Sequence, residues 1–512
     1  MEENFLNKNK VDITYILLLI LIIIAVFFVL GENFYSPYSD IGREFYLAEQ
    51  VKNGDVLYKD IFNVYSPLGY WLNAIIIKLF GSNLSTFYGI GVITSILTII
   101  PLFLIAKAYT NKHIAFTVAL FLIFSCTYYP SLSNWITPYS YSITYALCTT
   151  VWGFYFLHKF LTKENKKYLY ISALLAGLSI CFKYEYIGFI AVILGVSIYK
   201  KEYVKSIAFM FILPIVSLVI LLLQNCTIAD LIKSLNYMIG ISKSYSANYF
   251  YQFAGISPTI ESVKISFINL IHPQYRSIFA PICVVNFILL LLSIKKKDLL
   301  LSILLLTGIL TSVKTLGGIS LEVYGTYFFP LLFISLIASA CEKVTTRKTI
   351  IISIICLTLS FLYLSYEINE KIKFREINTT KGAFNIPKVF YHSTNDIIAY
   401  IHQDTNKNDK VLILPEGTII NFLTDRKSDK DLYYLIPPNA EIFSNEYIEN
   451  KIISKELDYI ITTNIQYPWY GEKSFMTGWG SEYIKLLNTE YKLVDIVGKN
   501  LKFYVYKHDI IK

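Results

Sequence analysis

Apolar runs recur along this chain, and they constrain its fold more than any other feature. A helix of about 20 apolar residues crosses the hydrocarbon core of a bilayer. Eleven runs approach that length: 13–31, 85–106, 113–129, 139–158, 168–182, 185–199, 204–223, 277–294, 298–314, 325–341 and 348–366. Only 16% of the 512 residues are charged, whereas an average soluble domain has about 25%. The sequence therefore predicts a polytopic α-helical membrane protein with about 11 spans.

Basic residues predict the direction of these spans. The connection 130–138 has none, whereas other connections are rich in lysine and arginine: 107–112, 159–167, 200–205, 295–297 and 343–348. Because cytoplasmic loops carry the excess of basic residues, we expect the N-terminus inside and the C-terminus outside. The alternation holds only if 67–80 does not cross, so we interpret it as an amphipathic helix in the outer interface. A short true span is the alternative. The net charge of +9 gathers in these short loops and does not indicate a nucleic-acid partner.

Three polar regions fall on the predicted outer side: the loops 32–84 and 224–276, and the C-terminal region 367–512. In the last region DKVLILPEG and LDYIITTN are typical of buried strands, and the alternating residues around Gly498 predict a hairpin. We therefore expect two domains. Residues 1–366 form a transmembrane domain, with juxtamembrane helices in its first outer loop, and the C-terminal region forms an extracytoplasmic soluble α/β domain.

The loop after the first apolar run carries the leading candidates for chemistry. It reads SPYSDIGREFYLAEQVKNG and predicts a helix from about residue 40 to 52. Asp40 and Glu44 are four residues apart and share a face of that helix. At a membrane surface Asp40 could act as a general base toward an acceptor hydroxyl or amine, and Glu44 is the second catalytic candidate. The alternative is that Asp40 is only a helix N-cap and Glu44 a solvated helix residue.

Further candidates interrupt later apolar runs. Lys183 and Glu185 stand in LSICFKYEYIGF, and Lys183 could bind a lipid phosphate as a point charge. The alternative is that this pair only turns the chain or reaches to the surface. Arg276 could help to hold the same phosphate or could be an interfacial anchor. The other candidates for substrate binding are Arg43, Tyr65 and Tyr324.

The layout resembles the GT-C superfamily of membrane glycosyltransferases, in the branch of protein O-mannosyltransferases and lipid A aminoarabinose transferases. Four segments carry the resemblance, which covers residues 1–366: SPYSDIGREFY, YSPLGYWLNAIIIKLFG, AGLSICFKYEY and EVYGTYFFPLLF. The chain departs from the family's Arg-Tyr motif, because Gly325 and Thr326 stand where the arginine is expected.

This resemblance implies a sugar transferase (hexosyl or pentosyl) at the outer face of the cytoplasmic membrane. The donor would be a polyprenyl-phosphate sugar among the membrane lipids, and the acceptor a glycan, lipid or protein. Asp40 matches the acidic residue that serves the family as base or metal ligand, and Lys183 matches the hairpin lysine. No cofactor is certain, and a divalent metal ion on Asp40 stays open. The alternative function is a transporter or flippase of a lipid-linked glycan. Such proteins show charges midway along their spans and internal repeats, whereas the spans predicted here are nearly free of charge midway and no repeat is visible.

Overall fold

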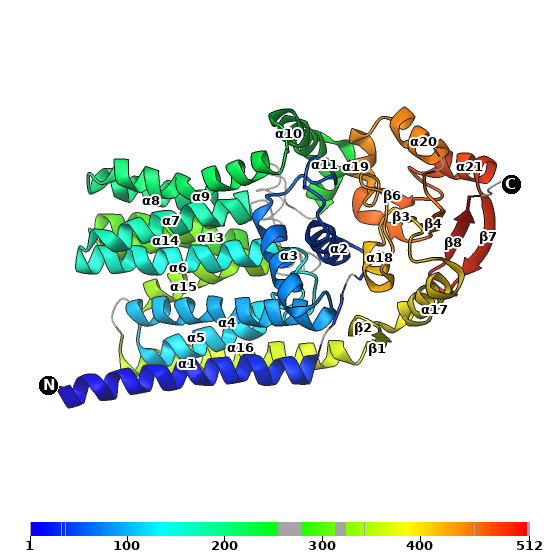
Figure 1. The fold of residues 1–512 in the computed structure, drawn as a ribbon. Helices are drawn as coiled ribbons and strands as arrows, with labels where there is room; N and C mark the ends of the chain where they lie inside the picture. The colour runs from blue at the N-terminus through cyan, green and yellow to red at the C-terminus, as the bar shows by residue number, and fades with distance from the viewer. Residues whose placement is uncertain are drawn as a thin grey trace.

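The computed structural model describes residues 2–31, 33–35, 37–253, 279–312, 324–341, 344–454 and 456–508. A helix lies at each of the eleven apolar runs, and Figure 1 shows these helices side by side in one bundle. They are α1 (Glu2–Leu30), α4 (Leu84–Tyr109), α5 (Lys112–Leu122, continued by a π turn over Ile123–Thr127), α6 (Tyr141–Lys163), α7 (Lys166–Phe182), α8 (Ile187–Tyr199), α9 (Tyr203–Leu223), α13 (Phe279–Lys295), α14 (Leu299–Thr311), α15 (Thr326–Ala340) and α16 (Thr346–Lys371).

Four of the described helices are long and apolar enough to cross a membrane, judged by length and composition: Asp12–Leu30, Leu84–Tyr109, Tyr203–Leu223 and Thr346–Lys371. Shorter apolar helices pack among them. These helices support the prediction of a membrane protein. The number of spans and their direction stay predictions.

Two shorter helices lie at one end of the bundle (Figure 1). The predicted helix of the first loop is confirmed as α2 (Asp40–Lys52). The helix ends at Lys52 with Asn53 as its C-cap, and Gly54 follows with a φ of 105°, in the region that favours glycine. The segment predicted as an amphipathic helix is α3 (Leu68–Phe80), which runs across the end of the bundle. Its expected position in the membrane interface stays a prediction. Helices α10 (Ile228–Lys243) and α11 (Tyr245–Phe253) lie at the same end.

The C-terminal region contains strands and short helices, as expected. Its four-stranded sheet has the order β3-β4-β8-β7, with β3 and β4 parallel and the other pairs antiparallel. The strands are β3 (Val411–Leu414), β4 (Tyr459–Thr463), β7 (Lys492–Val497) and β8 (Phe503–Lys507), and a small pair is β5 (Gln466–Tyr467) with β6 (Glu472–Ser474). The helices are α17 (Lys388–Asp404), α18 (Thr418–Thr424), α19 (Pro437–Ile442), α20 (Asn445–Ile453) and α21 (Ser481–Glu490).

One element departs from expectation. No strand was predicted between the last apolar run and DKVLILPEG, but this segment forms an antiparallel hairpin of β1 (Phe374–Thr379) and β2 (Gly382–Pro387). This hairpin buries Ile377 and Phe384, and the Phe384 ring lies 5.2 Å from that of Phe34. Helix α16 also continues past residue 366. The division into domains at 366 and 367 therefore stays a prediction.

Helix α2 lies between the bundle and the C-terminal region. The Phe45 ring packs on Phe87 of α4 with ring centres 4.2 Å apart, and on Phe422 of α18 at 5.4 Å. Lys381 forms ion pairs of 2.6 Å with Glu49 of α2 and with Asp425. Because the C-terminal region is docked on α2 in this way, its side chains reach the same place as the predicted site residues.

Candidate active site

A cavity of about 150 Å³ opens where α2, the end of α7 and the C-terminal region meet. Its charged lining residues are Asp40, Arg43, Lys183 and Glu185, and its tyrosines are Tyr65, Tyr139, Tyr184, Tyr324, Tyr433, Tyr434 and Tyr470. The cavity thus brings together six of the site residues predicted from the sequence. Two acidic and two basic side chains give its wall a formal charge near zero.

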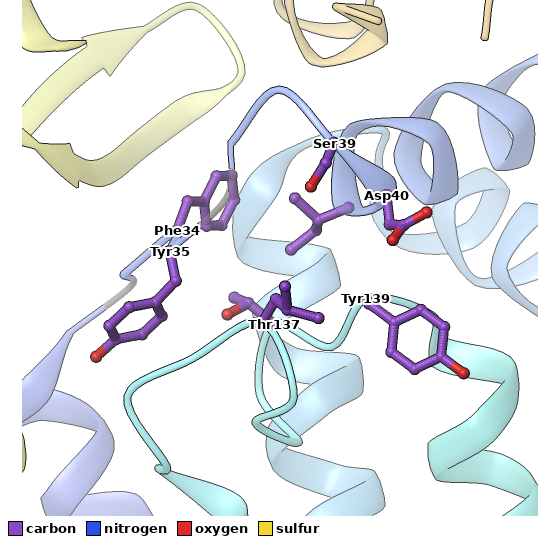
Figure 2. Close-up of a pocket in the computed structure, with 8 residues that line it drawn as sticks. Phe34, Tyr35, Ser39, Asp40, Thr137 and Tyr139 are labelled. Carbon is purple, nitrogen blue, oxygen red and sulfur yellow. The ribbon is translucent and has the colours of Figure 1, made fainter. Parts of the chain in front are cut away.

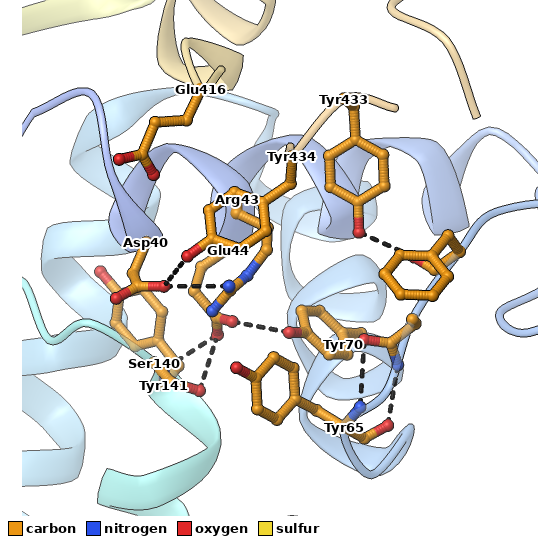
Figure 3. Close-up of polar contacts among 12 residues, drawn as sticks. Asp40, Arg43, Glu44, Tyr65, Tyr70, Ser140, Tyr141, Glu416, Tyr433 and Tyr434 are labelled. Atoms are coloured by element: carbon orange, nitrogen blue, oxygen red, sulfur yellow. Dashed lines mark hydrogen bonds and ion pairs between the residues drawn. The ribbon is translucent and has the colours of Figure 1, made fainter. Parts of the chain in front are cut away.

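Asp40 is the first residue of α2, and its carboxylate faces this cavity (Figure 3). Its Oδ1 lies 2.9 Å from Nη1 of Arg43 and accepts a 3.2 Å hydrogen bond from the Tyr434 hydroxyl. Among the residues that the structure describes, Oδ2 has no hydrogen-bond partner. The N-cap of α2 is Ser39, so the alternative reading of Asp40 as the N-cap is wrong. A carboxylate held by one oxygen leaves the other available to a ligand.

Two buried cations flank the Tyr65 ring. Nζ of Lys183 lies 4.1 Å from the ring centre, and Cζ of Arg43 lies 4.8 Å from it. Both side chains are buried, and such contacts hold a cation against the negative face of a ring. Lys183 is the C-cap of α7, where the chain turns into α8 as the sequence predicted. The two cations stand at the cavity wall, where they can hold a phosphate.

Glu44 has a different environment from the one expected. Its carboxylate does not line the cavity and accepts hydrogen bonds of 2.7 Å from the Tyr70 hydroxyl, 3.2 Å from Ser140 and 3.0 Å from the Tyr141 N–H (Figure 3). Burial raises the pKa of Glu44, and Arg43 opposes that shift. Glu44 therefore joins α2 to α3 and α6 and is not placed to contact a reacting group. The alternative that it is a solvated residue is wrong as well, because it is fully buried.

The other candidates have different outcomes. Tyr324 adopts a φ of 60°, and its ring centre lies 4.5 Å from that of Tyr139. Glu185 lines the cavity beside Lys183. Arg276 lies outside the residues that the structure describes, so its role stays a prediction. The loop 224–276 contributes to the lining through its described part, by Ile241 of α10 and by two residues of α11: Ala247 and Phe250.

Sequence reasoning missed Glu416, which follows β3. It is 5% exposed, and its Oε1 accepts a 2.8 Å hydrogen bond from Tyr467. Burial, together with the nearby charge of Asp40, raises the pKa of Glu416 to about 8. A signal existed, because residues that follow parallel strands often bind ligands. No comparable signal in the sequence marks the cavity tyrosines of the C-terminal region, which are Tyr433, Tyr434 and Tyr470.

A second, smaller cavity of about 10 Å³ also borders Asp40, and Figure 2 shows the residues that line it. Phe34, Tyr35 and Thr137 line it, and Asp40 and Tyr139 border both cavities. Its volume suits about one water molecule. Asp40 therefore borders both the large cavity and this small, mostly apolar one.

A metal site is not apparent in the described part of the chain. No three His, Cys, Asp or Glu side chains gather there in a way that could hold an ion. The divalent ion that the sequence left open on Asp40 stays a prediction, and no step below is derived through it.

Comparison with known proteins agrees with this architecture. Residues 65–225 match the family model of dolichyl-phosphate-mannose-protein mannosyltransferases. The fold is similar to ArnT from Cupriavidus metallidurans bound to undecaprenyl phosphate, with a TM-score of 0.50 and 10% identity over 97% of this chain and 98% of that one. It is also similar to the oligosaccharyltransferase of Archaeoglobus fulgidus in complex with Zn and sulfate. There the TM-score is 0.54 and the identity 12%, over 96% of this chain and 73% of that one. No curated protein sequence matches the chain.

These findings confirm the likeness to the GT-C superfamily. At 10% and 12% identity the solved structures show the fold alone. The family match adds the chemical class over residues 65–225 and supports a membrane glycosyltransferase.

Proposed function

We propose that this chain, which has the fold of the GT-C membrane glycosyltransferases, transfers a sugar from a polyprenyl-phosphate carrier to an acceptor. The reaction takes place at the outer face of the cytoplasmic membrane, where the C-terminal region faces the extracytoplasmic side. The donor class is supported by the similarity to ArnT, which was solved with undecaprenyl phosphate. The acceptor is a glycan, a lipid or a protein of the cell envelope.

The observation that carries this proposal is that the Asp40 carboxylate and two buried cations, Arg43 and Lys183, line the same cavity. Asp40 removes the proton from the acceptor hydroxyl through Oδ2, and the acceptor oxygen attacks the anomeric carbon of the sugar. The bond from that carbon to the phosphate oxygen breaks. The bonding electrons leave with the polyprenyl phosphate, whose charge Lys183 and Arg43 stabilise. The proton resides on Asp40 until it passes to solvent.

The remaining site residues take supporting roles in this proposal. Tyr65 contacts both Lys183 and Arg43 and so holds the two cations in place at the cavity. Tyr324 and Glu185 contact the donor sugar, and Arg276 assists with the phosphate. We assign Glu44 a positioning role instead of a catalytic one, because its three hydrogen bonds fix the register of α2 against the bundle.

The alternative, a transporter or flippase of a lipid-linked glycan, predicts different features. A transporter binds its cargo near the middle of the membrane between repeats. In this chain the four charged residues of the cavity gather at one end of the bundle, and the C-terminal region completes the cavity. That arrangement favours an enzyme that works at a surface.

The two functions are separated by one experiment on the purified full-length protein in lipid nanodiscs and in proteoliposomes. Radiolabelled polyprenyl-phosphate hexoses and pentoses are supplied with an envelope extract as the acceptor. The proposal predicts labelled glycoside and an equal amount of free polyprenyl phosphate from at least one donor. Intact labelled donor that only moves between leaflets would identify a transporter and overturn the proposal.

A further inference from the structure

Glu416 is held at a fixed point by a tight turn between β3 and α18. Its backbone pairs with that of Tyr434 in an antiparallel bridge. The next residue is Gly417, where an added Cβ would lie 2.4 Å from Cγ2 of Ile413. A larger residue would therefore push the turn away from the sheet. The position of the Glu416 side chain is set by the fold of the C-terminal region, and not by a flexible loop.

The Glu416 carboxyl is buried without a cation of its own. Oε1 accepts the hydrogen bond from Tyr467, and Oε2 is buried without a partner among the residues that the structure describes. The titratable and charged groups that face it are Asp40 and Arg43 of α2, Tyr434 of the bridging segment, Tyr467 of β5, and Tyr470. Arg43 makes its ion pair with Asp40. A buried carboxyl with no cation beside it favours the neutral form.

Figure 3 shows the Glu416 side chain extending from the C-terminal region toward the side of α2 that carries Asp40. Tyr434 connects the two acids, because its backbone bridges Glu416 and its hydroxyl donates to Asp40. Two carboxyl groups that share one site do not ionise together easily, and each takes a separate role when their environments differ. Here Asp40 has the ion pair with Arg43, whereas the buried Glu416 has one hydrogen bond from Tyr467 and no cation of its own among the described residues.

We propose that Glu416 is a positioning residue for sugar transfer: the C-terminal region inserts it as a neutral carboxylic acid beside Asp40, so that Asp40 is the one ionised carboxylate at this point. This inference rests on the function proposed above. It explains why the C-terminal region is docked so closely on α2. A second negative charge at Glu416 would compete with Asp40 for Arg43 and would oppose the charge of the donor phosphate. Loss of the Glu416 proton therefore stops transfer.

The test is the pH dependence of transfer by wild-type protein and by Glu416→Gln, which is a neutral side chain of the same shape. The transfer rate of each protein is divided by its own rate at pH 7, so that a difference in absolute rate between the two proteins does not affect the comparison. A group with a pKa of about 8 predicts a wild-type rate about tenfold lower at pH 9 than at pH 7. Glu416→Gln is expected to lose this decline. An identical decline in both proteins would overturn the inference.

A second variant guards against a Glu416→Gln protein that fails to fold. The hydroxyl of Tyr467 stabilises the Glu416 carboxylate and lowers its pKa, so Tyr467→Phe is expected to move the decline to higher pH. A decline at the wild-type pH in this variant would also contradict the inference. The outcomes remain distinct from failure of the proposed function. If wild-type protein transfers no sugar, that function is wrong, whereas transfer with an unchanged pH profile in the variants rejects only the role of Glu416.

Discussion

Gly42 of α2 lies directly against the backbone of Ile419 in α18. A Cβ added to Gly42 would lie 2.5 Å from the Ile419 nitrogen, which is closer than side-chain carbons approach other atoms. The contact joins α2, which carries Asp40, to α18, which follows Glu416 in the sequence. The position of the C-terminal region on α2 therefore determines how Glu416 lies relative to Asp40.

Gly42→Ala is therefore expected to separate α2 from α18 and to lower both stability and transfer. The overpacked contact should cost about 1–3 kcal/mol, measured as a lower thermal unfolding midpoint in detergent. The matched control is Gly89→Ala in α4, where an added Cβ meets no atom within 4 Å. Equal behaviour of the two variants would show that the close contact has no consequence.

Lys183→Met is expected to reduce transfer by about 100-fold, because removal of one group that stabilises a developing charge has an effect of that size. Lys183→Arg should restore part of the loss, since it returns a cation to the Tyr65 ring. The measurement is the initial rate of polyprenyl phosphate release. Lys430→Met, which removes an exposed lysine paired with Asp55, is the control and should behave as wild type. Full activity of Lys183→Met would remove Lys183 from the site.

Glu44→Ala tests the positioning role of Glu44 through stability. The change leaves the Tyr70 hydroxyl and the Tyr141 N–H buried without partners, and each such group costs about 1–3 kcal/mol. We expect a lower unfolding midpoint, with a smaller decrease for Glu44→Gln. The exposed Glu446 provides the control, because its replacement by alanine should change the midpoint little. If Glu44→Gln unfolded as wild type yet abolished transfer, Glu44 would be catalytic after all.

The raised pKa of Glu416 also predicts how stability changes with pH. Burial raises its pKa in the folded protein to about 8 from the ordinary 4.5 of a glutamate. Between these values the unfolded chain releases the proton and the folded chain keeps it, so the free energy of unfolding falls as pH rises. Glu416→Gln lacks this term. Its unfolding midpoint relative to wild type should rise from pH 5 to pH 8, and a difference that is constant with pH would contradict the assignment.

The sequence predicted the elements whose signals are local. The ends of α2 were correct because Ser39 and Gly54 mark them, and the hairpin around Gly498 was correct because its flanking residues alternate. Each apolar run became a helix for the same reason. The hairpin of β1 and β2 was missed because polar and apolar residues do not alternate along β1 (FREINT). Its register depends on burying Ile377 and Phe384 against other parts of the chain, and a single segment does not show that.

The site was predictable only in part, for a related reason. Asp40, Arg43, Tyr65 and Lys183 stand in segments whose charges or rings are unusual beside apolar runs, so the sequence singled them out. From the sequence Glu44 looked equivalent to Asp40, because the two lie on one face of the same helix. Their spacing does not show that α3 and α6 cover Glu44 and leave Asp40 at the cavity. The contributions of Glu416 and the other C-terminal residues depend on how that region docks on α2, which no local pattern encodes.

The most direct test of the account is transfer by Asp40→Asn compared with wild type, in nanodiscs with a donor that wild-type protein uses. Free polyprenyl phosphate and labelled glycoside are measured together, and size-exclusion profiles with unfolding midpoints verify folding. Asparagine keeps the shape of Asp40 and cannot accept the proton, so both products should fall at least about 100-fold. Product formation at the wild-type rate by a folded Asp40→Asn protein would show that Asp40 is not the base and would contradict the account.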